Sequence, residues 1–257
     1  MFTIPTPKLG HVTAITISSP DPEASLQFYQ KLGFSEVRRM DFPVPWIHVS
    51  DGALLIMLKK DTTPYIALTY YADNIEKMAI DLEAQGIQFK EKPGSSDFVK
   101  RYIIKSPDGT SISLVHVPAN EFQQPTGPTM LTMAQEDYMK PEKYVNKSIG
   151  MWGEFAESVR DLEVSLKFWE KLGFVTLSKY EQPQPWAIIS DGLAIVGLHQ
   201  THEWTGYPVM TFFAADRKEK LEKLRNDGLE FHKDYSGGNV VLKTPENQYI
   251  HLFNMTM

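Results

Sequence analysis

Short stretches of alternating hydrophobic and polar residues, followed by helical patterns, run through the chain. In HVTAITIS, residues 11–18, the alternation predicts a strand. The next stretch, DPEASLQFYQKLG at 21–33, has apolar residues at helical spacing, with a helix start signal at one end and a helix stop signal at the other. Asp21 can cap the N-terminus, Pro22 suits the first turn, and Gly33 suits the position after the last turn. Together they predict a strand followed by a short amphipathic helix.

Three further strand-like runs follow this helix. They are FSEVRRMDF, WIHVS and ALLIMLKK, and Asp51-Gly52, a strong hairpin signal, separates the last two. The same βαβββ order recurs three more times along the chain. We therefore expect four βαβββ modules, at about 8–60, 64–117, 148–200 and 205–257.

The amino-acid sequence also contains an internal repeat. DPEASLQFYQKLGF at 21–34 recurs as DLEVSLKFWEKLGF at 161–174, 140 positions later and without a gap, which indicates two homologous halves. Between them lies a stretch rich in Pro, Gln and Thr that is typical of a linker, and its Met and Tyr residues indicate that it packs on a domain surface. We expect a first domain at 1–117, a linker at 118–147 and a second domain at 148–257.

Composition narrows the class of protein. Apolar residues make up 42% of the 257 positions and charged residues 23%, which is typical of a globular protein. The net charge of −6 and the scattered basic residues argue against a nucleic-acid partner. No apolar run reaches the length of a membrane span, and the first residues do not resemble a signal peptide, so a cytoplasmic protein is expected. Because the chain has no Cys, His, Asp, Glu and water would have to hold any metal.

The motif D-x-E-x-S-L-x-F-[YW]-x-K-L-G-F after the first strand, and P-D-G before the last strand, resemble the vicinal oxygen chelate superfamily. That superfamily includes glyoxalases, extradiol dioxygenases, and fosfomycin and bleomycin resistance proteins. The resemblance implies an α+β fold with two domains, each an eight-stranded cup built from two βαβββ modules. It also implies inward ligand positions on the first and last strands, where a divalent ion can chelate vicinal oxygens.

The ligand positions that the resemblance implies differ between the two halves. In the first half they carry Ala14, Met57, Ala67 and Ser113, so we expect no metal there. In the second half they carry Glu154, seven residues before Asp161, and His251 on the last strand. His199 is a third candidate ligand at the end of a strand, because Gly197 and Val209 occupy the remaining positions and cannot ligate.

Two interpretations of Glu154 and His251 stay open from the sequence. They could share a metal ion or form an acid/base pair in a water-poor cup, or they could form a buried ion pair or hydrogen bond that satisfies both groups without catalysis. Trp152, Trp186 and Tyr207 are candidate substrate-binding walls, although Trp186 could equally be a core residue.

The leading hypothesis is a bleomycin resistance-like protein that binds a small organic molecule in the second domain, with Glu154 and His251 as polar anchors. The alternative is a metal-dependent enzyme, either a glyoxalase-type lyase or isomerase or a dioxygenase, in which Glu154, His251 and His199 hold Fe, Mn, Ni or Zn. An interaction module without catalysis is a third class. Strand edges of such cups often pair, which makes a homodimer plausible.

Overall fold

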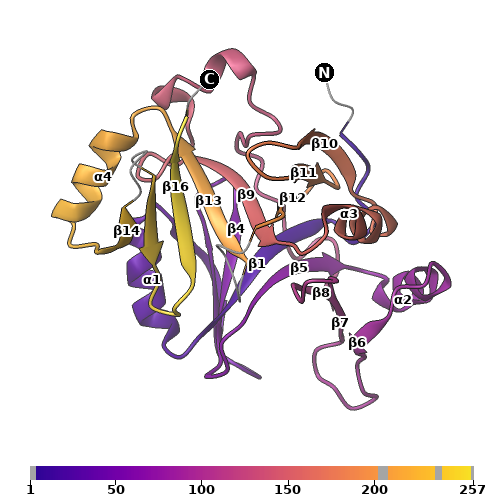
Figure 1. Cartoon of the computed structure of the whole chain (residues 1–257). Coiled ribbons are helices and arrows are strands. Elements are labelled where there is room, and N and C mark those ends of the chain that lie inside the picture. The colour runs from indigo at the N-terminus through magenta and orange to yellow at the C-terminus, as the bar shows by residue number, and fades with distance from the viewer. Residues whose placement is uncertain (1–3, 202–207, 235–238, 256–257) are drawn as a thin grey trace. The chain divides into compact units, whose positions relative to one another are not determined.

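The computed structural model describes residues 4–201, 208–234 and 239–255 and contains two eight-stranded sheets. The strand orders are β2-β3-β4-β1-β5-β8-β7-β6 and β10-β11-β12-β9-β13-β16-β15-β14 (Figure 1). Each sheet takes four strands from each of two successive βαβββ modules, and the first strands of the two modules are neighbours at its centre. The predicted α+β class and the four modules are confirmed.

The first sheet and its helices follow the predicted order of elements. Their bounds are β1 Val12–Ser19, α1 Pro22–Lys31, β2 Ser35–Met40, β3 Trp46–Ser50, β4 Leu55–Lys60, β5 Ile66–Ala72, α2 Ile75–Ala84, β6 Phe89–Glu91, β7 Arg101–Lys105 and β8 Ser111–His116. The helix α1 packs against β3 and β4, and α2 packs against β7 and β8.

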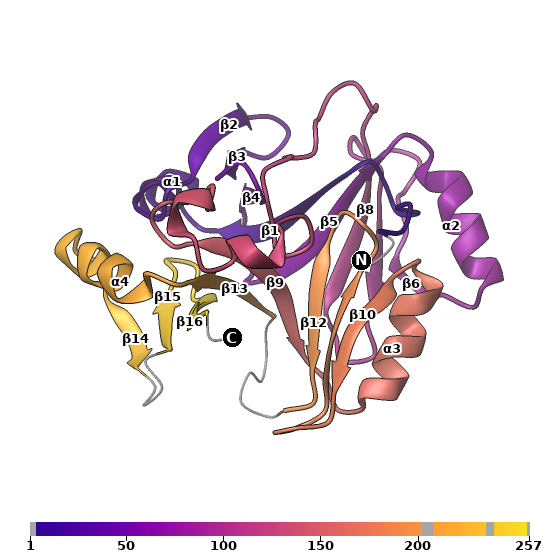
Figure 2. The same ribbon diagram turned by 90° about the horizontal axis from the view of Figure 1, so that it is seen from above.

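The second sheet repeats this order. Its elements are β9 Met151–Ser158, α3 Leu162–Lys171, β10 Val175–Tyr180, β11 Trp186–Ser190, β12 Ile195–His199, β13 Val209–Ala214, α4 Arg217–Asn226, β14 Phe231–Asp234, β15 Val240–Lys243 and β16 Tyr249–Asn254. The helix α3 packs against β10 and β12, and α4 against β16. Both views show α4 alongside β14 and α2 beside β6 (Figures 1 and 2).

The predicted helix ends are confirmed. Asp21 caps α1 by accepting hydrogen bonds from the backbone N–H groups of Glu23 and Ala24, at 3.2 and 3.3 Å. Asp161 caps α3 by accepting one from the N–H of Val164, at 3.1 Å. Gly33 follows α1 with a φ of +88°, a conformation that glycine adopts at little cost. No helix among the described residues is long and apolar enough to cross a membrane.

The Asp-Gly hairpin is also confirmed, with a loop of four residues. Ser50 at the end of β3 pairs with Leu55 at the start of β4. Within the loop, the carboxylate of Asp51 accepts hydrogen bonds from the N–H groups of Ala53 and Leu54, at 2.9 and 2.8 Å. The side chain of Asp51 thus supplies the acceptor that these two backbone donors need, so the loop can be buried.

Contacts between Cα atoms divide the chain into two compact units that do not coincide with the two sheets. Compact unit 1 comprises residues 1–15, 66–124 and 155–208, and compact unit 2 comprises residues 16–65, 125–154 and 209–257. The strands β1 and β9 contribute residues to both units. The division into domains at residues 117 and 148 follows the sheets and stays a prediction.

Most of the linker belongs to compact unit 2, where Asn146 anchors it. The side-chain amide of Asn146 is buried and donates hydrogen bonds to the carbonyl of Leu32, at 3.0 Å, and to the carboxylate of Asp51, at 3.1 Å. Its carbonyl oxygen accepts hydrogen bonds from the N–H groups of Ser148 and Ile149. The linker therefore packs on the protein, as its composition predicted.

Replacing Asn146 should destabilise the protein more than replacing an exposed linker asparagine. We expect Asn146→Ala to lower the free energy of unfolding by about 2–4 kcal/mol, because it leaves buried groups of Leu32 and Asp51 without partners. Urea unfolding would measure the change. The control Asn120→Ala alters an exposed residue. Equal effects of the two substitutions would contradict the anchoring role of Asn146.

Candidate functional site

Glu154 and His251 lie on the two strands that flank β13 in the second sheet. Glu154 is on β9 and His251 is on β16, and each side chain is only 4% exposed. Thr211 of β13 lies between them: it is the register partner of His251 and is hydrogen-bonded to the backbone of Glu154. The fold thus places both predicted anchors within compact unit 2, on strands separated by β13 alone.

A side chain joins β9 to β13 at this point. The hydroxyl of Thr211 accepts a hydrogen bond from the N–H of Glu154 at 3.0 Å and lies 3.2 Å from the carbonyl oxygen of the same residue. The close approach requires Gly153, because a Cβ atom there would lie 2.7 Å from Thr211 Oγ1 and 2.4 Å from Phe213 Cε2. Thr211 and Gly153 therefore position the backbone that carries Glu154.

Trp152 is almost fully buried in an aromatic cluster of compact unit 2. It is 6% exposed, and its ring centroid lies 5.3 Å from that of Phe212, which in turn lies 6.4 Å from that of Phe34. Both contacts are edge-to-face, the arrangement that aromatic quadrupoles favour. Trp152 therefore contributes to the core, and its role as a wall for a ligand stays a prediction.

Trp186 and His199 stack on each other in compact unit 1. Their ring centroids are 5.8 Å apart with planes only 4° from parallel, and Tyr180 stacks on Trp186 at 4.4 Å. The three residues are cross-strand partners on β10, β11 and β12, so the stack follows from the register of the sheet. Tyr207, the third predicted wall residue, lies outside the described residues.

The donor set does not fit a metal ion of the type that the resemblance implies. Glu154 and His251 supply two donors, while the remaining ligand positions carry Gly197 and Val209, whose side chains offer none. Among the residues that the structure describes, no group of three or more His, Asp or Glu side chains could hold a metal ion. The role of His199 as a third ligand stays a prediction.

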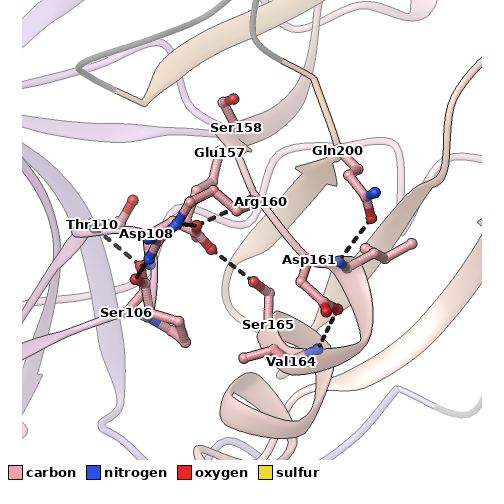
Figure 3. A network of polar contacts seen from close by, with 12 residues as sticks. Ser106, Asp108, Thr110, Glu157, Ser158, Arg160, Asp161, Val164, Ser165 and Gln200 are labelled. Atoms are coloured by element: carbon pink, nitrogen blue, oxygen red, sulfur yellow. Dashed lines mark hydrogen bonds and ion pairs between the residues drawn. The ribbon is translucent and has the colours of Figure 1, made fainter.

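Compact unit 1 contains a buried carboxyl group that sequence reasoning missed. Glu157 on β9 is 2% exposed, and the hydroxyl of Ser106, in the turn between β7 and β8, donates a hydrogen bond to it (Figure 3). Burial raises the pKa of Glu157, while hydrogen bonds from Ser106 and Thr110 act in the opposite direction. Trp169 of α3 lies beside this carboxyl group.

The same turn holds the start of α3 through a second acidic residue. The carboxylate of Asp108 accepts hydrogen bonds from the backbone N–H and the Nε–H of Arg160, each at 3.0 Å, and from the hydroxyl of Ser165 at 2.9 Å (Figure 3). Ser106 and Asp108 together connect the β7–β8 turn to β9 and α3. This network is structural: it fixes the strand that carries Glu154.

Alternation along β9 relates the two glutamates. Glu157 lies on the face that α3 covers, since it is beside Trp169. Glu154, three positions earlier, lies on the opposite face of the strand. The sequence signal for Glu157 was weak: its counterpart in the first half is Ile17, and its partner Ser106 is 51 positions away.

Comparisons with known proteins agree with this architecture. Residues 8–114 match the family model described as Glyoxalase/Bleomycin resistance protein/Dioxygenase superfamily. No curated protein matches the chain.

Among the solved structures that resemble the chain are two dioxygenases and a glyoxalase. A catechol 2,3-dioxygenase is 13% identical, with a TM-score of 0.54 over 95% of this chain and 90% of that one. The 2,3-dioxygenase LapB from Pseudomonas sp. KL28 is 13% identical, with a TM-score of 0.59 over 99% and 94%. The Mn(II)-bound glyoxalase from Novosphingobium aromaticivorans is 14% identical, with a TM-score of 0.58 over 97% and 82%. Identities this low establish a shared fold alone.

The raised pKa of Glu157 predicts a pH dependence of stability. Because the folded protein binds this proton more tightly than the unfolded chain, the contribution of Glu157 is most favourable below the ordinary glutamate pKa and is lost as the pH rises through the raised folded value. We expect Glu157→Gln to reduce the fall in unfolding free energy between about pH 4.5 and pH 8. Urea unfolding across this range would measure it.

The exposed residue Glu222 provides the matched control. Glu222→Gln should leave the pH dependence as in the wild-type protein. Asp51 and Asp191 also have pKa values raised by burial, so some dependence should remain in Glu157→Gln. An unchanged slope in Glu157→Gln would show that Glu157 titrates as an ordinary glutamate.

Proposed function

Because residues 8–114 match the model of the Glyoxalase/Bleomycin resistance protein/Dioxygenase superfamily and the second half repeats the same fold, we propose that the second domain, residues 148–257, binds a small organic molecule without a resident divalent metal ion. One observation carries this proposal: the fold is retained, but only Glu154 and His251 remain at the ligand positions of the second sheet. Two donors fall short of the three that metal sites of this kind normally use.

In the proposed site, Glu154 and His251 recognise the polar groups of the ligand. The carboxylate of Glu154 can accept hydrogen bonds from an N–H or O–H group, and the imidazole of His251 can donate or accept one. Both residues are buried, where hydrogen bonds and charge interactions are stronger than in water. Trp152, which lies in the same compact unit, would supply an apolar wall, which suits a ligand with a planar or apolar body.

The first domain, residues 1–117, would serve as a structural or binding partner without metal. Its ligand positions carry Ala14, Met57, Ala67 and Ser113, and Ala14 and Ser113 are buried. Alanine and methionine at these positions are poor ligands for a hard divalent ion. Small-molecule recognition by the first domain would therefore rest on shape and neutral hydrogen bonds.

A metal-dependent enzyme of the glyoxalase or dioxygenase type is the second candidate. The similarity to a Mn(II)-bound glyoxalase and to catechol 2,3-dioxygenase favours it. When bound, such a metal would act as a Lewis acid, and Glu154 and His251 would hold it. The described residues provide no third ligating side chain beside these two.

Metal analysis of the protein purified without chelator separates the two candidates. We expect far less than one Mn, Fe, Ni or Zn per chain, with no further change in Glu154→Gln or His251→Ala. The control His116→Ala removes an exposed histidine of the first sheet. Stoichiometric metal that both Glu154→Gln and His251→Ala remove, but His116→Ala retains, would establish the metalloenzyme instead.

Ligand binding provides a second prediction. The two compounds to test are metal-free bleomycin and catechol, which the names of the matching family and of a similar structure suggest. We expect calorimetric titration to show saturable binding of at least one of them. Glu154→Gln and His251→Ala should each weaken that binding about 10-fold or more, because a buried partner of the ligand is lost. Binding that neither substitution affects would place the site elsewhere.

A further inference from the structure

The face of the second sheet that carries His251 also carries two phenylalanines. Phe213 on β13 is the register partner of Phe253 on β16, and this pair lies two positions from the pair of Thr211 and His251. Side chains two positions apart on a strand point to the same face, so His251, Phe213 and Phe253 share one face in compact unit 2. The ring centroids of Phe213 and Phe253 are 5.4 Å apart, and those of Phe253 and His251 are 5.7 Å apart.

Gly153 on β9 makes room for the ring of Phe213. A Cβ atom on Gly153 would lie 2.4 Å from Cε2 and 2.7 Å from Cδ2 of Phe213, which is closer than real Cβ atoms come. The missing side chain therefore lets the phenylalanine ring lie directly against the backbone of the neighbouring strand. The ring is thus held in place by β9 and by Phe253.

Both phenylalanine rings are only half-buried. Phe212, which alternates with Phe213 on β13, is by contrast fully buried. Within the described part of the chain, the only aromatic ring that contacts this pair is that of His251. Apolar ring surface in contact with water is unfavourable, so a flat apolar group that covers it would be stabilised there.

The first sheet shows what covers the equivalent ring in compact unit 1. Tyr71 on β5 corresponds to Phe213, since each is the register partner of a residue on the last strand of its sheet half. Tyr71 is only 3% exposed, because the ring of Phe122 from the linker packs on it. Their centroids are 4.8 Å apart with planes 36° from parallel. In the second sheet, Phe253 stands where the first has Val115, and it leaves Phe213 half-buried.

A backbone contact supports this equivalence. The N–H of Val117, just after β8, donates a hydrogen bond to the carbonyl of Ala72 at 3.0 Å. The N–H of Met255, just after β16, donates one to the carbonyl of Ala214 at 3.3 Å. The chain therefore leaves the two strands along the same path, and Phe122 marks where a further aromatic ring fits.

Building on the proposed function, on which this step rests, we infer that the ligand contains a planar aromatic ring that packs on Phe213 and Phe253. The ligand ring would take a place like that of Phe122 in the first sheet. Aromatic rings favour offset or edge-to-face contacts with centroids about 4.5–7 Å apart. A polar group on the ligand ring would bond to the imidazole of His251, which can donate or accept a hydrogen bond. The two phenylalanines thus select planar rings over saturated ones.

Calorimetric titration with 2-naphthol and its saturated counterpart decahydro-2-naphthol tests this inference. Both compounds offer one hydroxyl to His251, but only 2-naphthol has aromatic faces. The wild-type protein should bind 2-naphthol at least about 10-fold more tightly. Phe253→Leu keeps an apolar side chain but removes the ring, so it should weaken binding of 2-naphthol about 3- to 10-fold and that of decahydro-2-naphthol little. The control Phe98→Leu, which alters an exposed ring of compact unit 1, should change neither.

A second variant and a direct measurement cover the case in which Phe253→Leu does not fold. Phe213→Leu should weaken binding of 2-naphthol to a similar extent. In the wild-type protein, NMR should show nuclear Overhauser effects between the ring protons of 2-naphthol and those of phenylalanine, and their absence from a saturated complex would overturn the inference.

Two further outcomes would overturn the inference while the proposed function stands. They are equal affinity of the wild-type protein for the two compounds, and binding of 2-naphthol that His251→Ala weakens but both leucine variants leave unchanged. Binding of neither compound would overturn the inference as well, and titration with metal-free bleomycin would then test the proposed function on its own.

Discussion

The hydroxyl of Ser106 donates a hydrogen bond to Glu157, and this buried contact constrains the strand on which the candidate site is built. A carboxyl group in a protein interior is tolerated only where donors reach it. Ser106 and Thr110 reach Glu157 from the β7–β8 turn, and Asp108 of the same turn holds the start of α3. These contacts fix which face of β9 is turned toward α3. By alternation, they also fix the opposite face, which carries Glu154.

The next constraint acts between β9 and β13. Thr211 bonds to the backbone of Glu154, and Gly153 allows the strands to approach, so the position of Glu154 is set by its neighbours more than by its own contacts. The position of His251 is set by the register of β13 and β16, in which it pairs with Thr211. Glu154 and His251 are therefore held on the two strands either side of β13. Residue identity, with Val209 and Gly197 in place of donors, distinguishes a proposed binding site from a metal centre.

The fold could be predicted from the sequence because the signals for its helices and hairpins are local, and because the sequence is repeated in the second half. The helix caps Asp21 and Asp161, the hairpin at Asp51-Gly52 and the repeat at 140 positions each depend on residues close together in the chain. The family pattern then selected Glu154 and His251, which the structure places on strands either side of β13.

Other contacts could not be predicted in this way. The hydrogen bonds of Glu157 with Ser106 and of Asn146 with Leu32 join residues 51 and 114 positions apart, and neither leaves a periodic signal. The stacking of His199 on Trp186 depends on strand register, which the alternation of residues alone does not give.

We propose that the second sheet, with only Glu154 and His251 at the expected ligand positions, does not hold a divalent metal ion. Titration of Mn(II) into chelator-stripped protein, followed by the electron paramagnetic resonance signal of free Mn(II), tests this claim most directly. The account predicts that added Mn(II) stays free at stoichiometric concentrations, in the wild-type protein and in Glu154→Gln alike. Tight binding of one Mn(II) per chain that Glu154→Gln abolishes would contradict it.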